Sequence, residues 1–228
     1  MLESLPDTLH VLSIVLVPAL LGIILHEVAH GFVAYRKGDP TAAAMGRLTL
    51  NPLPHVDPMG LLVFILTSLS SSFIFGWAKP VPVDVRYFRD PFKDMMQVAL
   101  AGPLTNALLA TLCAALMRLQ LWLLPPAEWA DAGAYAFALS SLYAGVSVNM
   151  GLCWVNMLPI PPLDGSKVLA YFLPAGMRMG YLGMERYGLV ILVLLLFCGL
   201  LGDILMPLVL GGRHALLDVF GLTAYGLE

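Results

Sequence analysis

Residues 8–35 read TLHVLSIVLVPALLGIILHEVAHGFVAY, and this stretch decides the fold. A helix rises 1.5 Å per residue, so about 20 apolar residues cross the roughly 30 Å hydrocarbon core of a bilayer. The stretch is longer than that, with Glu27 as its one carboxylate and with no lysine or arginine. It predicts a membrane-spanning helix that carries polar side chains in its second half.

The rest of the chain has the same apolar character. Hydrophobic residues make up 59% of the 228 residues and charged residues 12%, whereas a soluble domain carries about 25% charged residues. Further apolar segments lie at 59–76, 95–121, 132–158 and 186–211, of which only 59–76 is short for a span. Proline clusters separate the segments, and such broken backbone is tolerated at membrane depth only against protein or a water-filled cavity.

We therefore predict an all-α polytopic membrane protein, a bundle of about four to six transmembrane helices with proline-broken re-entrant loops. Short β patterns at 45–50 and 81–85 add a small membrane-associated β-hairpin to this expectation. The length suits a single domain over residues 1–228, with a core at about 8–175 and an accessory C-terminal helix at about 186–211.

Charge and cysteine content narrow the possible partners and the orientation. The net charge of −3 and the lack of a basic block argue against nucleic acid as a partner. The three cysteines form no CxxC pair, which argues against a disulfide framework. Arg36 and Lys37 follow the first helix, and the positive-inside tendency places them in the cytoplasm. The polar residues of that helix then lie near the cytoplasmic side of the membrane.

Those polar residues form HEVAH, residues 26–30. On a helix, His26 and His30 share one face and can bind one metal ion, while Glu27 stands beside them as a general base; zinc hydrolases use this HExxH arrangement. Ionisable groups within a membrane segment are costly and are candidates for function. The alternative is a pair of histidines that only form hydrogen bonds within a helix bundle.

A catalytic zinc site needs a third protein ligand and leaves one position for water. His10 and His214 lie at segment ends, where solvated interfacial positions are expected. Asp164 lies in NMLPIPPLDGSKVL, an apolar stretch broken by prolines, where a carboxylate is costly unless it meets a cation. Its residue type also suits the N-cap of a helix that begins at Gly165, and the residues alone leave both interpretations open.

Five motifs together resemble the site-2 protease family of intramembrane zinc metalloproteases, and within it the short prokaryotic branch without a PDZ domain. They are HEVAH, NPLPHVDPMG, FGWAKPVPVD, ALAGPLTN and NMLPIPPLDG, and the match runs from about residue 20 to 170. The pairing of HExxH with N-x-x-P-x-x-P-L-D-G is specific to that family when both motifs lie in membrane segments.

The resemblance implies a role for each matching position. His26, His30 and Asp164 would bind one Zn²⁺ per chain, and Glu27 would activate the water. Asn156 matches an asparagine that steadies the substrate carbonyl or oxyanion. His55 would contact the substrate or support the metal site, unless it is an ordinary loop histidine. Asn106 would make a polar contact between helices or only support packing.

The predicted function is that of an intramembrane zinc endopeptidase in a prokaryotic cell (inner) membrane. It would cut peptide bonds within or near the transmembrane helices of other membrane proteins, in the lipid bilayer. A metal-ion transporter is the alternative from another class, although it has no need for Glu27 beside His26. A catalytically inactive relative is the third possibility.

Two structural expectations follow from this function. A strand at 45–50 would hold an unwound substrate by edge pairing. Asp164 must also reach the depth of His26, so segments 95–121 and 132–158 have to cross the membrane in opposite directions. Segment 59–76 should then re-enter or form a hairpin rather than cross once.

Overall fold

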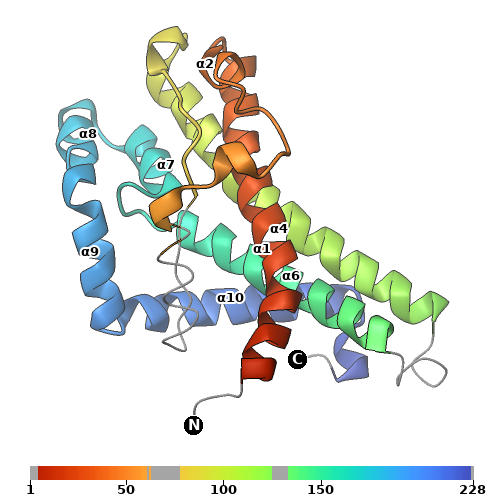
Figure 1. Ribbon diagram of the computed structural model, residues 1–228. Coiled ribbons are helices and arrows are strands. Elements are labelled where there is room, and N and C mark those ends of the chain that lie inside the picture. The colour runs from red at the N-terminus through yellow and green to blue at the C-terminus, as the bar shows by residue number, and fades with distance from the viewer. Residues whose placement is uncertain (1–4, 61, 63–77, 125–132, 227–228) are drawn as a thin grey trace.

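In the computed structural model the chain is a bundle of long helices (Figure 1). The structure describes residues 5–60, 62, 78–124 and 133–226. The α-helices are α1 (Leu5–Arg36), α2 (Thr41–Ala44), α4 (Pro91–Leu123), α6 (Gly133–Asn156), α7 (Asp164–Phe172), α8 (Ala175–Leu182), α9 (Glu185–Phe197) and α10 (Leu200–Val219). Three short 3-10 helices join them, at Leu53–His55, Val85–Tyr87 and Thr223–Tyr225.

Helices α1, α4 and α6 pack against one another and form the core of the bundle. Ala110 and Ala114 of α4 are fully buried, and their small side chains let the helix backbones approach closely. Met117 on the same helix and Val146 and Met150 on α6 complete the cluster between these helices. Interlocking small and large side chains therefore hold α4 on α6.

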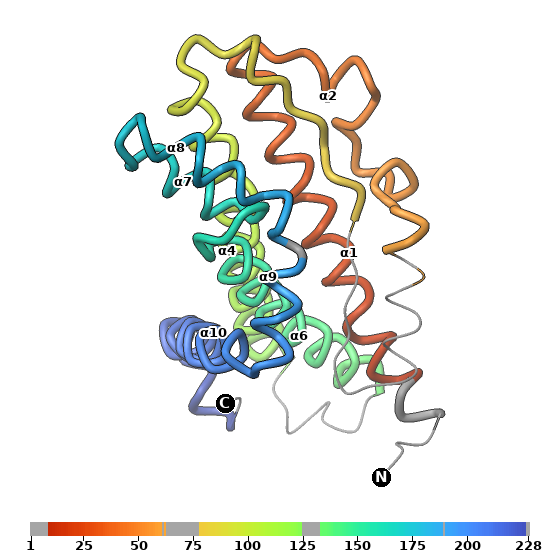
Figure 2. The backbone as a smooth tube through the Cα atoms, turned by 90° about the vertical axis from the view of Figure 1, so that its left-hand side faces the viewer, coloured from red at the N-terminus to blue at the C-terminus, as the bar shows by residue number. Residues whose placement is uncertain are grey.

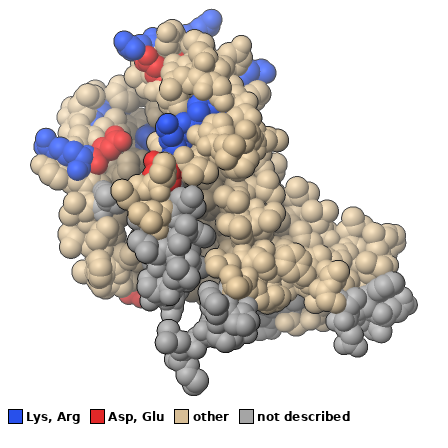
Figure 3. Space-filling view, in the orientation of Figure 1, with Lys and Arg blue, Asp and Glu red and all other residues tan. Residues whose placement is uncertain are grey.

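Four of the described helices are long and apolar enough to cross a membrane: Leu9–Arg36, Pro91–Leu123, Gly133–Asn156 and Leu200–Val219. The outer face of α4 is apolar as well, since leucines repeat along it at 104, 108, 112, 116 and 119. In Figure 3 the charged side chains gather over the end where α1 finishes and α4 begins, and over α8. The prediction of an all-α membrane protein is confirmed for the described residues.

The predicted β-hairpin is wrong. Within the described ranges the structure has no sheet, and only an isolated bridge pairs Val56 with Ala78. The segment at 45–50 turns at Gly46, which has a φ of 66°, and continues as bends. The segment at 81–85 lies next to Pro80 and contains Pro82, and proline has no N–H to donate to a strand ladder. Residues 45–50 form no strand, and the edge pairing of a substrate on them stays a prediction.

The predicted accessory helix at 186–211 is divided. The chain turns at Cys198 and Gly199, so that α9 ends and α10 sets off in another direction (Figures 1 and 2). Apolar composition continues across this turn, which is why the sequence reads as one helix. The prediction for segment 59–76 falls mostly on residues 61 and 63–77, which lie outside the described residues.

Candidate metal centre

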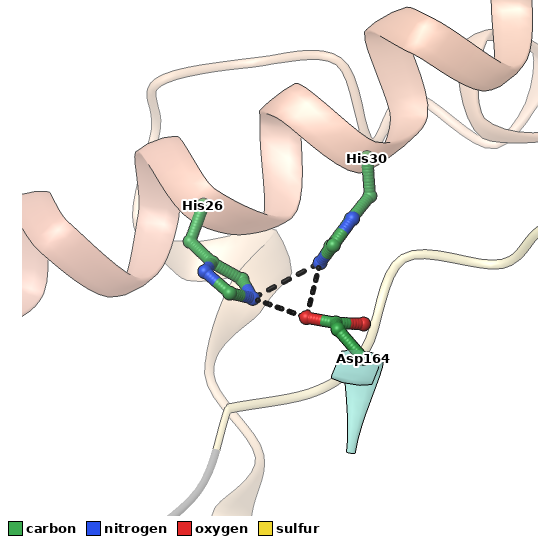
Figure 4. Close-up of side chains that lie close together, drawn as sticks. All are labelled: His26, His30 and Asp164. Carbon is green, nitrogen blue, oxygen red and sulfur yellow. Dashed lines mark hydrogen bonds and ion pairs between the residues drawn. The ribbon is translucent and has the colours of Figure 1, made fainter. Parts of the chain in front are cut away.

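His26 and His30 project from one face of α1, as their spacing predicts, and Asp164 faces them from the start of α7 (Figure 4). The two Nε2 atoms lie 3.0 Å apart. Each Nε2 is 3.2 Å from Oδ2 of Asp164. All three side chains are buried, and among the described residues they form the one group of three that could hold a metal ion.

Asp164 reaches this position because the proline-rich segment after α6 turns the chain back toward α1. The N-cap position of α7 belongs to Leu163, so Asp164 is not an N-cap but the first residue of the helix. Gly165 allows the close return: a Cβ at this position would lie 2.2 Å from the carbonyl oxygen of Met157. The other carboxylate oxygen of Asp164, Oδ1, lies 3.5 Å from Nζ of Lys167.

A second layer of contacts orients the two imidazoles. Nδ1 of His26 lies 2.6 Å from Oδ1 of Asn106, and Nδ1 of His30 lies 2.7 Å from the carbonyl oxygen of Val98. Asn106, which is fully buried, donates from Nδ2 to the carbonyl of Gly22 and to Oδ1 of Asn149. These contacts tie α1, α4 and α6 together at the depth of the histidines.

The same contacts decide where the imidazole protons are. A backbone carbonyl only accepts, so Nδ1 of His30 must donate to Val98. Asn149 donates from Nδ2 to the carbonyl of Gly145, which leaves its Oδ1 to accept from Asn106. Oδ1 of Asn106 is therefore an acceptor as well, and Nδ1 of His26 donates to it. When imidazoles held in this way are neutral, as metal ligands are, both Nε2 atoms present a lone pair to the space beside Asp164.

Two nitrogen lone pairs and a carboxylate oxygen thus converge in a buried space. Three acceptors repel one another unless a cation lies among them. A tetrahedral zinc with ligands at about 2.0–2.1 Å has neighbouring ligand atoms about 3.3 Å apart. The observed separations of 3.0 and 3.2 Å come close to that value. The residues present therefore fit a zinc ion, with two nitrogen ligands and one oxygen ligand.

Gly102 of α4 leaves the space that the histidines need. A Cβ at this position would lie 2.5 Å from Cε1 of His26 and 2.5 Å from Nε2 of His30. Any larger residue would push the rings away from Asp164. The glycine of the ALAGPLTN motif is therefore required for the two histidines to approach Asp164.

Glu27 lies beside the cluster and is held by a separate segment. Its Oε2 accepts a hydrogen bond of 2.7 Å from the backbone N–H of Val81. Val81 belongs to residues 79–84, which we call the strap. Lys79 of the strap donates from its N–H to the carbonyl of His55 and accepts from Nη2 of Arg47.

The other end of the strap is fixed by acids outside the membrane helices. The N–H of Asp84 donates to Oδ2 of the buried Asp39. Hydrogen bonds from Arg86 lower the pKa of the Asp84 carboxyl. The strap is thus anchored on both sides of the residue that contacts Glu27, which gives the carboxylate a defined position.

The remaining predicted site residues lie outside the ligand cluster. Asn156 is the last residue of α6 and donates from Nδ2 to the carbonyl of Leu152, 2.9 Å away. His55 is buried, with Nε2 at 2.9 Å from the carbonyl of Thr49. The role predicted for Asn156 stays a prediction. His55 contacts the strap through its carbonyl rather than the metal ligands.

Sequence reasoning named Asn106 as a polar contact between helices but missed the other residues that orient the ligands. Asn149 is a buried amide in the middle of an apolar segment, and its polarity was the available signal. Val98 and Val81 contribute backbone atoms, which side-chain patterns do not reveal. His10 and His214 are exposed and far from any cluster of ligands, as expected for segment ends.

Comparisons with known proteins place this site in a family. YwhC of Bacillus subtilis, named as a candidate zinc metalloprotease, is 32% identical over 213 residues, 93% of this chain and 93% of that protein. Rip2 of Mycolicibacterium smegmatis, named likewise, is 31% identical over 90% of this chain and 73% of its own length. The chain belongs to this zinc metalloprotease family. The recognition of a site-2 protease-like family from the motifs is confirmed.

A third relative has the same kind of name. MJ0611 of Methanocaldococcus jannaschii, again named as a candidate zinc metalloprotease, is 32% identical over 66% of this chain and 65% of its own length. No family model and no solved structure matches the chain. The relatives thus support a metalloprotease that uses zinc, in agreement with the donor set of the site.

Proposed function

We propose that this protein is an intramembrane zinc endopeptidase, with His26, His30 and Asp164 as the metal ligands. The observation that carries the proposal is the convergence of two Nε2 atoms and one carboxylate oxygen beside Glu27, in a bundle with helices of membrane length. A bound zinc would supply a Lewis acid that activates water and polarises a peptide carbonyl. The family relationship supports the same chemistry.

The residues of the chain divide the remaining work. Glu27 takes the proton of the attacking water and returns it to the leaving amine nitrogen. Its Oε2 is engaged by Val81, which leaves Oε1 for the water. We assign to Asn156 the stabilisation of the oxyanion, which requires its amide to turn from Leu152 toward the substrate.

The substrates follow from the depth of the site. His30 precedes Arg36 by six residues, so it lies about 9 Å along the helix from that charged end. A peptide bond that reaches the metal there lies inside the membrane, near one of its surfaces. The positive-inside tendency makes this the cytoplasmic surface. We therefore infer that the substrates are transmembrane helices of other proteins, cut near their cytoplasmic ends.

The site supports a protease better than a transporter. A transport path needs ligands in succession, and the part of the chain that the structure describes holds one cluster of this kind. A transporter also gives no reason to fix Glu27 beside the cluster. The intact set of Glu27 and the three ligands argues against an inactive relative.

The first experiment measures zinc bound to the detergent-purified protein and to Asp164→Ala. We expect about one zinc per chain in the wild type and a large loss in the variant, since catalytic zinc requires three protein ligands. Asp218→Ala is the matched control, because Asp218 is an exposed aspartate of α10. No zinc in the folded wild type, or equal zinc in Asp164→Ala, would overturn the proposed site.

The second experiment tests proteolysis. Membrane fractions from cells that express the wild type or Glu27→Gln are compared for fragments of membrane proteins. Cuts that occur only with the wild type, within or next to transmembrane helices, are the expected result. Cuts confined to soluble loops, or equal in both strains, would contradict an intramembrane endopeptidase.

A further inference from the structure

Helix α10 runs across the bundle rather than along it. In Figure 1 it lies nearly perpendicular to α1, and in the view turned by 90° it is seen along its axis (Figure 2). Both views place it at the level of the N-terminal part of α1, away from the end where α4 begins, and it packs mainly against α6. A helix of 20 residues in this direction does not cross the same bilayer as α1.

Three polar residues of α10 lie on one side of the helix, whereas Arg213 points toward Tyr143 of α6. Asp203, His214 and Asp218 are all exposed. At 3.6 residues per turn they fall within about 60° of one another around the helix axis. We call these three residues the polar stripe. Within the described part of the chain, none of them makes a side-chain hydrogen bond or ion pair.

The opposite side of α10 faces the protein. Val209 and Leu216 lie about 180° from the polar stripe, and both pack against the core cluster of α4 and α6. Large apolar side chains flank the stripe on both sides and are exposed, among them Ile204, Met206 and Leu210. An outward polar stripe between two apolar flanks is the pattern of a helix that lies in a membrane interface.

A spanning α10 would be costly. The face that points away from the bundle would then meet lipid tails, and that face carries two aspartates and a histidine. Ionisable residues in membrane segments almost always face the bundle interior or a water-filled cavity. The polar stripe points away from the bundle interior. Its side chains are therefore stable against water and lipid headgroups but not against hydrocarbon.

Contacts at the end of α10 agree with an interfacial level. Nη1 of Arg118, near the end of α4, lies 3.0 Å from the hydroxyl of Tyr225, which follows α10. The guanidinium of Arg213 stacks over the ring of Tyr143 of α6, at 5.2 Å. Arginine and tyrosine are typical of the boundary between lipid and water. The first pair ties the residues after α10 to the last turns of α4, and the second ties α10 to the middle of α6.

We propose that α10 is not a span but an interfacial helix, with the lipid headgroup layer on the side opposite the metal centre as its partner. The polar stripe faces water and headgroups, and the apolar flanks enter the outer edge of the hydrocarbon. The residues after α10 then lie on the same side of the membrane as the beginning of α1. Such a helix limits how the bundle tilts and so sets the depth of the metal centre.

The test uses single cysteines in a full chain whose Cys113, Cys153 and Cys198 are replaced by alanine. Asp203→Cys, His214→Cys and Asp218→Cys are exposed in turn to a membrane-impermeant maleimide in intact spheroplasts. Arg86→Cys marks the side of the metal centre, and the core-facing Val209→Cys is the matched control on α10. Retained zinc binding verifies that each variant is folded.

All three stripe positions should react on one side of the membrane, with Arg86→Cys reacting from the other side and Val209→Cys only after denaturation. Reaction of Asp203→Cys and Asp218→Cys from opposite sides would show that α10 spans and would overturn the proposal. Protection of all three positions would place the stripe in hydrocarbon or protein and would overturn it as well.

Discussion

The metal centre and the polar stripe of α10 contain the same residue types, histidine and aspartate. At the metal centre the side chains point into the bundle, and each imidazole has a partner on both nitrogens. On α10 the side chains point outward and have no side-chain partner among the described residues. The two regions therefore differ in the direction of their side chains rather than in residue type.

Of the substitutions in the two regions, Glu27→Gln should lower the cleavage rate most. Loss of the general base should lower the rate of cleavage by about 10²–10⁴-fold. Zinc content should stay near one per chain, because Glu27 is not among the three ligands. Asp218→Asn changes a carboxylate on the stripe to an amide and should leave the cleavage rate unchanged. A rate comparable with the wild type in Glu27→Gln would remove Glu27 from the mechanism.

Asn106→Leu tests the layer behind the ligands. The substitution leaves Nδ1 of His26 without its acceptor, so zinc affinity should fall about 10–100-fold. A competing chromophoric chelator measures the affinity, and the visible spectrum of the Co²⁺-substituted protein reports on the ligand geometry. Asn149→Leu is one contact further from the metal and should give a smaller loss. Equal losses in both variants would indicate that the amides act only through packing.

Val81→Pro tests the contribution of the strap to catalysis separately from that of the metal ligands. Proline removes the N–H that binds Glu27, and a hydrogen bond to a charged group contributes about 1.5–3 kcal/mol. We expect kcat to fall roughly 10–100-fold, with KM and zinc content retained. Val81→Ala keeps the N–H and loses only side-chain packing, so it should retain most of kcat. If kcat of Val81→Ala falls as far as kcat of Val81→Pro, the hydrogen bond from the strap to Glu27 does not account for the loss of activity.

His214→Ala has the smallest expected effect. An exposed side chain without a partner contributes little to stability, within about 0.5 kcal/mol. Thermal unfolding and zinc binding should match the wild type, whereas His26→Ala should lose zinc. Loss of zinc in His214→Ala would mean that the two ends of the molecule are coupled, against the comparison made above.

Part of the fold could be predicted from local patterns. Apolar length predicts α1, α4 and α6 because a span needs a continuous run of about 20 residues. The same signal failed at residues 186–211, since composition does not register the turn at Gly199. The β pattern at 81–85 failed for a different reason, since proline has no N–H to donate to a strand ladder.

By itself, the sequence determined the class of protein and the pair of histidines. A spacing of four residues places His26 and His30 on one helix face whatever surrounds them. Only the tertiary structure decided that Asp164 faces the histidines instead of capping α7, that Asn106 and Asn149 orient His26, and that Val81 holds Glu27. These contacts join segments far apart in the chain. Helix periodicity is local, whereas convergence depends on how whole helices pack.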